Sequence, residues 1–217
     1  MLLTDDTLRY LDHYIWIHNN PRTNISYRIF GDPWSWNKIF SLYGNPDCEI
    51  MQLPSELRWL LGKFIKLQPK NVLEIGNAQG GTLYYWLKHS LPNSKVVGVD
   101  INHGQIASME VLTDTKLTLV TGNSTSIEIV NQVKNIFNNA PVDFLFIDGN
   151  HNLAQADFDI YSTLVKKGII AFHDINPNRI APATNVCWEN VKQNNNWEEY
   201  CEHCPDDNGL GIGIINI

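Results

Sequence analysis

Apolar residues follow two different periods along this chain. Short runs of consecutive apolar residues alternate with longer segments in which apolar residues recur every three or four positions. Consecutive apolar runs are typical of strands that are buried on both faces, and the longer period is typical of helices with one buried face. The predicted strands are 72–75, 96–99, 117–121, 142–147 and 169–172, and the helices predicted between them are 82–89, 104–112, 124–137 and 153–166.

Strands that alternate with helices predict a parallel sheet whose crossover connections are right-handed. The pattern continues with a helix near 184–193 and two further segments, 197–203 and 210–217. These two segments lie too close together for another helical crossover, so they should pair antiparallel. We therefore expect a doubly wound α/β fold, with a mostly parallel seven-stranded sheet that is completed by a C-terminal antiparallel hairpin.

The length of 217 residues suits one α/β domain with an N-terminal extension. Residues 54–217 carry the alternating pattern, and a helix should open it at Pro54, because apolar residues from Leu57 onward share one face. Residues 1–53 combine a helical pattern at 4–18 with an aromatic-rich stretch interrupted by glycine and proline. Such a stretch either covers a binding site as a lid or anchors the extension to the domain, and both interpretations stay open.

The charge balance argues against several classes of partner. Lys and Arg number 16 against 23 Asp and Glu, so the formal net charge is −7, and the sequence contains no basic run. Nucleic acids and anionic membranes require basic patches, so we expect neither as a partner. The expected partner is a small-molecule substrate, and assembly into a homo-oligomer stays open. No segment resembles a signal peptide or a membrane span, which predicts a cytoplasmic protein.

The four cysteines are unevenly spaced, unlike the framework of a disulfide-rich secreted protein. Cys201 and Cys204 have the spacing of a pair of zinc ligands, which Cys187 could join. A single pair of this kind is a weak signal, so a surface turn at 201–204 is the favoured interpretation.

The stretch from 71 to 100 combines a strand, a glycine-rich turn, a helix and a second strand that ends in an acid. The turn reads GNAQGG at 76–81, and the acid is Asp100. Glycine allows positive φ angles and close approach of a ligand to the backbone, while a carboxylate that ends a strand can accept both hydroxyls of a ribose. These features indicate a site for a nucleoside-containing cofactor, with an ordinary strand-to-helix turn as the alternative.

The spacing of the glycines distinguishes between cofactors. A dinucleotide site would read G-x-G-x-x-G and aim a helix at a pyrophosphate. This chain has Glu74 on the strand, then Gly76, and its next glycines at Gly80 and Gly81. A carboxylate so close to the turn would repel a pyrophosphate. The motif resembles motif I of class I S-adenosylmethionine-dependent methyltransferases, which implies a Rossmann-like methyltransferase core and S-adenosylmethionine as cofactor.

Ligands of open α/β sheets bind at the carboxyl ends of the strands. Two acids and two histidines follow the strands 142–147 and 169–172, namely Asp148, His151, His173 and Asp174. Their motifs, IDGNH and GIIAFHD, resemble those of the small-molecule methyltransferases grouped with cephalosporin-hydroxylase-like proteins and macrolide-sugar O-methyltransferases. The resemblance extends over about residues 50–217 and includes the segment IMQLP ahead of the first helix.

The metal-dependent branch of that group implies a Mg²⁺ site formed by Asp148, Asp174 and His173, with His151 as the base that accepts the proton of the substrate hydroxyl. Mg²⁺ prefers carboxylate and water oxygens, and a neutral imidazole is a suitable base near pH 7. Ile175 departs from the pattern, because the relatives have a second adjacent ligand there. A helix cap for Asp148 and a satisfied core histidine at position 173 are the alternatives.

The resemblance also implies which residues bind the cofactor. Asn123 stands where the relatives often have an acid at the adenine, and an amide can still hydrogen-bond there. The predicted function is S-adenosylmethionine-dependent O-methyl transfer to a small hydroxylated acceptor, such as a sugar or another metabolite. A non-catalytic S-adenosylmethionine-binding regulatory domain and a hydroxylase-type oxidoreductase are the alternatives, and the second lacks a convincing 2-His-1-carboxylate spacing. The predicted cofactor-binding residues are Glu74, Gly76, Asn77, Gly80, Asp100, Ile101, Asn123, Ser124 and Asp148.

Overall fold

The computed structural model describes residues 52–78, 80–103, 116–177, 181–201 and 210–217. The helix expected at 4–18, the aromatic-rich stretch and the helix expected at 104–112 lie outside these ranges, as does almost all of the predicted extension 1–53. In the part of the chain that is described, no helix combines the length and the apolar character that crossing a membrane requires.

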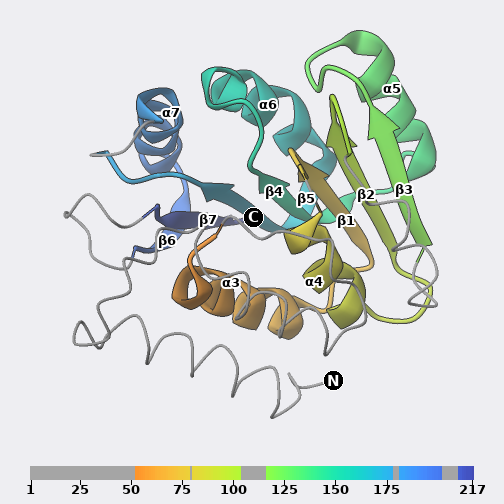
Figure 1. Ribbon diagram of the computed structural model, residues 1–217, viewed down its shortest axis with the longest axis horizontal. Helices are drawn as coiled ribbons and strands as arrows, with labels where there is room; N and C mark the ends of the chain where they lie inside the picture. Colours follow the sequence, from red (N-terminus) through yellow and green to blue (C-terminus); the bar gives the residue numbers. More distant parts are fainter. Residues whose placement is uncertain (1–51, 79, 104–115, 178–180, 202–209) are drawn as a thin grey trace, which may run out of the picture.

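Seven strands of the described residues form one sheet, in the order β3-β2-β1-β4-β5-β7-β6 (Figure 1). The first five strands run parallel, and β7 lies antiparallel between β5 and β6. This arrangement confirms the predicted mostly parallel sheet with a C-terminal antiparallel hairpin. The strands are β1 Asn71–Ile75, β2 Lys95–Asp100, β3 Lys116–Thr121, β4 Val142–Ile147, β5 Val165–His173, β6 Asn196–Tyr200 and β7 Ile212–Asn216.

Helices cover both faces of the sheet (Figure 1). α3 (Pro54–Leu67) and α4 (Gly81–His89) lie on one face, and α5 (Ile127–Ile136), α6 (Ala154–Tyr161) and α7 (Pro182–Lys192) lie on the other. Short 3-10 turns precede and follow α6, at His151–Leu153 and Ser162–Leu164. The helices cover the two faces of the sheet, and the carboxyl ends of the parallel strands lie together along one edge of this layered structure, which we call the rim.

Two predicted helix boundaries were wrong. α5 begins three residues later than expected, because the chain from Asn123 first makes a turn. The helix predicted to reach Lys166 ends at Tyr161, and β5 already begins at Val165. A register shift between β4 and β5 inserts Lys166 and Lys167 into the strand, where a bulge lets both side chains reach water.

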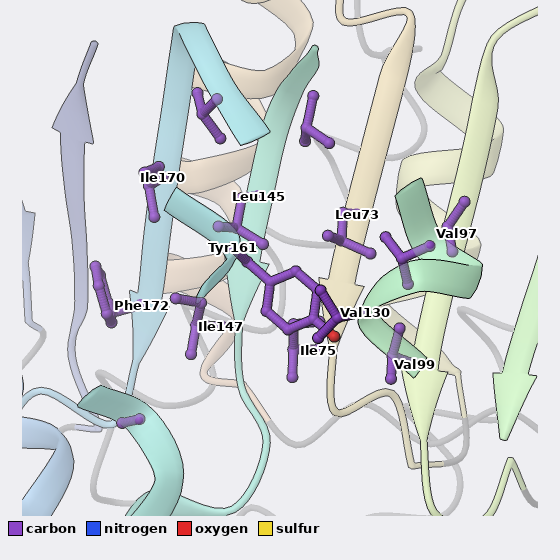
Figure 2. Packing of buried hydrophobic residues seen from close by; sticks show 14 of the residues in the cluster. Leu73, Ile75, Val97, Val99, Val130, Leu145, Ile147, Tyr161, Ile170 and Phe172 are labelled. Carbon is purple, nitrogen blue, oxygen red and sulfur yellow. The ribbon is translucent and has the colours of Figure 1, made fainter. Parts of the chain in front are cut away.

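Alternate residues of each strand contribute to two separate apolar cores, because strand side chains alternate between the faces. Val72, Phe144 and Phe146 join α3 and α4 in one core, where the rings of Phe64 and Trp86 lie with centroids 4.9 Å apart. The intervening residues of the strands pack against α5, α6 and α7 in the other (Figure 2). The residues labelled there are Leu73, Ile75, Val97, Val99, Val130, Leu145, Ile147, Tyr161, Ile170 and Phe172.

At one edge of the sheet, β6 has all five of its residues exposed. Glu198 on one face forms an ion pair with Lys63 of α3 at 2.5 Å. Glu199 on the other face accepts a hydrogen bond of 2.8 Å from the Trp188 indole and lies 3.4 Å from the Lys192 ammonium. Side chains of the flanking helices thus attach this strand to the domain from both faces.

A buried acid connects α6 to the loop after β3. Asp157 is 1% exposed and hydrogen-bonds to the side chain of Ser124, whose carbonyl oxygen accepts a hydrogen bond of 2.6 Å from the Tyr161 hydroxyl. Burial raises the pKa of Asp157 to about 6, although the hydrogen bond from Ser124 opposes the shift. One carboxyl oxygen, Oδ1, has no hydrogen-bond partner among the described residues. The fold therefore tolerates Asp157 better as a neutral acid than as an anion.

Replacing Asp157 with Asn should stabilise the protein at alkaline pH. A folded-state pKa of about 6 against 3.8 in the unfolded chain means that the wild type loses stability as the pH rises from about 4 to 6. The variant lacks this loss, so its free energy of unfolding should exceed that of the wild type by about 3 kcal/mol at pH 8 and not at pH 4. Denaturant titrations at both pH values would measure it. Asp159→Asn, on the exposed side of the same helix, is the control, and a destabilised Asp157→Asn variant at pH 8 would contradict the prediction.

Candidate active site

The residues predicted to bind ligands lie where the parallel strands end. Gly76 follows β1, Asp100 ends β2, Asn123 lies two residues after β3, and Asp148 and Asp174 follow β4 and β5. Because the five strands run parallel, these residues share one rim of the sheet. The predicted convergence of the candidate site residues on this rim follows from the observed strand order.

Glycine at position 76 allows the turn after β1 to lie against the end of β4. Gly76 has a φ of 83°, and a Cβ atom there would overlap the carbonyl oxygen of Asp148 and the Cα atom of Gly149. Gly80 has a φ of 81° and is the N-cap residue of α4. No side chain fits at Gly76 without moving the backbone of β4, so the two glycines shape the turn that faces the rim.

Asp100 holds this turn in place. Its Oδ2 atom accepts hydrogen bonds from the backbone amides of Asn77, at 2.8 Å, and Ala78, at 2.9 Å. Its Oδ1 atom accepts a bond of 3.1 Å from the amide of Asn102. The neighbouring Ile101 is 77% exposed, so its apolar side chain is open to a ligand at the rim. Asp100 therefore fixes the turn in addition to any role toward a ribose.

Glu74 does not open onto the rim, because strand alternation directs it to the same face as Val72, beneath α4. It is fully buried, and the Thr82 hydroxyl donates to its Oε1 atom at 2.5 Å. Burial raises the pKa of Glu74 well above its usual value, and the Thr82 bond only partly opposes this, so burial favours the neutral form of the group. Its role as a cofactor residue stays a prediction. In this structure Glu74 could affect a cofactor only indirectly, through its contact with Thr82 of α4.

The side chain of Asn77 also lies inside the turn. It is 3% exposed, and neither end of its amide has a hydrogen-bond partner in the described part of the chain. Its Nδ2 atom occupies the space that a Cβ atom at Gly98 of β2 would need. Asn77 therefore packs the turn against β2, and its role toward a cofactor likewise stays a prediction.

Asn123 works as a local cap in the loop after β3. Its Oδ1 atom accepts hydrogen bonds from the Thr125 amide, at 3.1 Å, and the Thr125 hydroxyl, at 3.0 Å. Ser124 is held by Asp157 and Tyr161, as described above. Because the Asn123 oxygen is already engaged by Thr125, the side-chain nitrogen is the group that could donate a hydrogen bond to an adenine edge.

Asp148, His173 and Asp174 form a compact cluster at the ends of β4 and β5. The Nδ1 atom of His173 lies 3.0 Å from Oδ1 of Asp148 and 3.2 Å from Oδ2 of Asp174. Asp174 has a φ of 58°, a left-handed conformation that Asp adopts more readily than most residues. Asp148 pairs with a histidine, and the cap of the following turn is Asn150. His173 is buried, and its Nε2 atom has no hydrogen-bond partner within the described residues.

The electrostatics of the cluster favour a cation between the two carboxylates. Burial disfavours a charged imidazole, but Asp148 and Asp174 outweigh it and raise the pKa of His173 well above its usual value. Burial would also raise the pKa of Asp174, but His173 and His151 outweigh it and lower that pKa. Burial raises the pKa of Asp148, with His173 opposing the shift. The two carboxylates therefore favour a positive charge at the position of the His173 imidazole.

The same three residues fit a divalent metal ion. One ligand atom from each of Asp148, His173 and Asp174 lies within 4.8 Å of the others. Two carboxylates suit Mg²⁺ or Mn²⁺, and the imidazole suits Mn²⁺ better than Mg²⁺. Ile175 is an apolar, buried residue and contributes nothing to the set. Among the described residues, His151 is not part of this group of ligand atoms.

His151 lies at the outer side of the cluster, in the 3-10 turn after β4. Its Nε2 atom is 2.9 Å from Oδ2 of Asp174, and its side chain is 42% exposed. The hydrogen bond to Asp174 raises the pKa of His151 above its usual value, although partial burial opposes the shift. The imidazole is thus accessible from solvent and adjacent to the acids, as a base for a bound hydroxyl would have to be.

Sequence reasoning missed two residues that support the site, Gln52 and Asp157. Gln52 is 3% exposed, and its Nε2 atom donates to Oδ2 of Asp148 at 2.5 Å. The only sign of Gln52 in the sequence is an amide within the apolar segment IMQLP. The only sign of Asp157 is an acid on the buried face of a predicted helix.

The weak zinc alternative is not supported, because Cys187 is a buried free thiol and Cys201 is disulfide-bonded.

Three solved structures of the same fold have titles that name O-methyltransferases. An O-methyltransferase from Bacillus cereus in complex with SAH is 15% identical, covers 100% of this chain and 93% of its own, and gives a TM-score of 0.59. The O-methyltransferase TomG from Streptomyces achromogenes, involved in tomaymycin synthesis and in complex with SAM, is 12% identical, with 100% and 99% covered and a TM-score of 0.60. A putative O-methyltransferase from Klebsiella pneumoniae is 14% identical, with 75% and 80% covered and a TM-score of 0.59.

At such low identities, these likenesses speak for the fold, and they confirm the predicted Rossmann-like core. None of the curated proteins matches the chain. A family model does, over residues 37–202, and its description is Rhamnosyl O-methyltransferase/CmcI. This match spans both the glycine-rich turn and the Asp–His cluster. The chain therefore belongs to the Rhamnosyl O-methyltransferase/CmcI family, within the class I S-adenosylmethionine-dependent methyltransferases.

Proposed function

We propose that this protein transfers the methyl group of S-adenosylmethionine to a hydroxyl of a small acceptor, such as a sugar, with help from a divalent metal and a histidine base. The observation that carries the proposal is the contact between two half-sites. The glycine-rich turn, held by Asp100, lies directly against Asp148 of the Asp–His cluster. The titles of similar structures, which name SAH and SAM as ligands, support the same cofactor here.

The cofactor would lie along the glycine-rich turn. Asp100 would accept the ribose hydroxyls with the carboxylate that now orders the turn, and the exposed Ile101 would contact the adenine. Ser124 and the free amide nitrogen of Asn123 would reach the adenine edge from the loop after β3. Glu74 and Asn77, both buried, would keep α4 and the turn in position. Because the turn lies against Asp148, a cofactor bound along it would have its sulfonium group near that residue.

The metal and the base would act on the acceptor. Asp148, Asp174 and His173 would hold the ion, which lowers the pKa of a hydroxyl bound to it. His151 would accept the hydroxyl proton on Nδ1, because its Nε2 atom faces the Asp174 carboxylate and donates to it. The hydroxyl oxygen would bond to the methyl carbon as the carbon–sulfur bond breaks in line, and the electron pair of that bond would stay on sulfur to give S-adenosylhomocysteine. The protein mainly supplies orientation for this displacement.

The cofactor assignment predicts that S-adenosylhomocysteine binds and that NAD and NADP do not. Asp100→Ala removes a charged acceptor worth about 1.5–3 kcal/mol, so the dissociation constant for S-adenosylhomocysteine should rise about 10- to 100-fold in calorimetry. Asp143→Ala is the matched control, because Asp143 accepts two backbone amides, at 2.9 Å each, near the start of β1. That variant should bind like the wild type. Preferential binding of NAD would overturn the cofactor assignment.

The metal assignment predicts that turnover collapses on chelation and returns with Mg²⁺ or Mn²⁺, because the acceptor hydroxyl would otherwise keep its proton. A screen of sugars and other hydroxylated compounds with a labelled methyl donor would provide the acceptor for this assay. Calorimetry with S-adenosylhomocysteine in the presence of chelator is the control, since the fold and the cofactor site should persist without metal. Full turnover in excess chelator would exclude the metal from the mechanism.

The base assignment predicts that His151→Ala lowers kcat by about 10²–10⁴, as removal of a general base does. The dissociation constant for S-adenosylhomocysteine should change little, because His151 faces the acids and not the glycine-rich turn. Asn152→Ala, one residue along the same exposed turn, is the control and should retain turnover. A His151→Ala variant with near-normal kcat would make His151 structural and His173 the next candidate.

A further inference from the structure

We infer that Gln52 is a positioning residue of the metal site, which fixes the carboxylate of Asp148 through the hydrogen bond from its side-chain amide. The inference rests on the proposed function, because it assigns a role toward the metal that Asp148 would bind. Gln52 lies 96 residues before Asp148 in the sequence and outside the motifs of the rim. It reaches the site from the segment just ahead of α3.

The backbone around Gln52 is firmly attached to the domain. Pro54 is the first residue of α3, a position that suits proline, and the Leu57 amide donates to the Leu53 carbonyl oxygen at 2.9 Å. Leu53 and Leu57 are both buried, at 3% and 1% exposure. An amide on such an anchored segment approaches Asp148 from a fixed direction, unlike one on a free loop.

The two oxygens of Asp148 are held by different donors. Oδ1 faces Nδ1 of His173 at 3.0 Å, and Oδ2 accepts from Nε2 of Gln52 at 2.5 Å. A donor on each oxygen determines the rotation of the carboxylate about its Cβ–Cγ bond. If the Gln52 donor were removed, Oδ2 would lose its partner in a site where the Asp148 side chain is only 13% exposed, and the carboxylate could turn.

The chemistry of an amide suits this task. A lysine or arginine at the same place would also hold Asp148, but its positive charge would oppose a metal ion at the cluster. Glutamine donates without charge, so Asp148 keeps the negative charge that the metal requires. The partners of metal-binding carboxylates typically change metal affinity 10- to 100-fold when they are removed. Gln52 is the described residue that fits such a role for Asp148.

Gln52→Met tests the inference, since methionine is of similar length and cannot donate. We expect the Mn²⁺ dissociation constant, measured by electron paramagnetic resonance on the S-adenosylhomocysteine complex, to rise about 10- to 100-fold. The dissociation constant for S-adenosylhomocysteine should stay unchanged, which a general loss of structure would not allow. Gln52→Asn, which keeps the amide but shortens its reach by one methylene, should weaken Mn²⁺ binding in the same direction and keeps the test valid if the Met variant folds poorly.

Gln155→Met is the matched control, because Gln155 donates to Asp159 at 2.9 Å in an exposed pair of the same chemistry. Its Mn²⁺ affinity should equal that of the wild type. Unchanged Mn²⁺ affinity in folded Gln52→Met and Gln52→Asn variants would overturn the inference and leave the proposed function intact. Absence of Mn²⁺ binding to the wild type would overturn both the metal assignment and the role of Gln52.

Discussion

The close approach of two strand ends at Gly76 is the constraint on which the site depends. The Gly76 amide donates to the Val99 carbonyl oxygen of β2, and the Asp148 amide donates to the Ile75 carbonyl oxygen of β1, each at 2.8 Å. With no side chain at Gly76, the turn after β1 can rest on the backbone of Asp148. The glycine-rich turn and the Asp–His cluster are therefore in direct contact, and a methyl donor bound along the turn would lie next to the acids.

The acids of the site divide into two kinds according to burial. Glu74 and Asp157 are enclosed by the domain, their pKa values are raised, and their hydrogen bonds connect α4 to β1 and α6 to the loop after β3. Asp148 and Asp174 lie at the rim, where histidines balance their charge. Two enclosed acids thus connect elements of the fold, while two acids at the rim face the candidate site, although all four appear in the sequence as the same two residue types.

The fold followed from the sequence because continuous apolar runs and helical periods leave few arrangements for alternating elements. Even the burial of Glu74 could have been predicted, since strand alternation puts it on the face of Val72. The prediction extended α6 to Lys166, whereas the helix ends at Tyr161 and β5 begins at Val165. The sequence did not reveal this early start of β5, because the bulge that contains Lys166 depends on the pairing with β4. The Gln52–Asp148 bond was missed for a related reason, because contacts between residues far apart in the sequence leave no trace in local periodicity.

The strand at the open edge of the sheet has a consequence for contacts between copies of this chain. An exposed edge strand offers unpaired backbone groups to any other strand. If two copies joined through β6 in antiparallel register about its centre, Glu198 would oppose Glu198 and Glu199 would oppose Trp197. Facing carboxylates repel each other, and Lys63 and Lys192 are already engaged within their own copy. Among the described residues, the charges along this edge therefore oppose an antiparallel extension of the sheet from one copy to another.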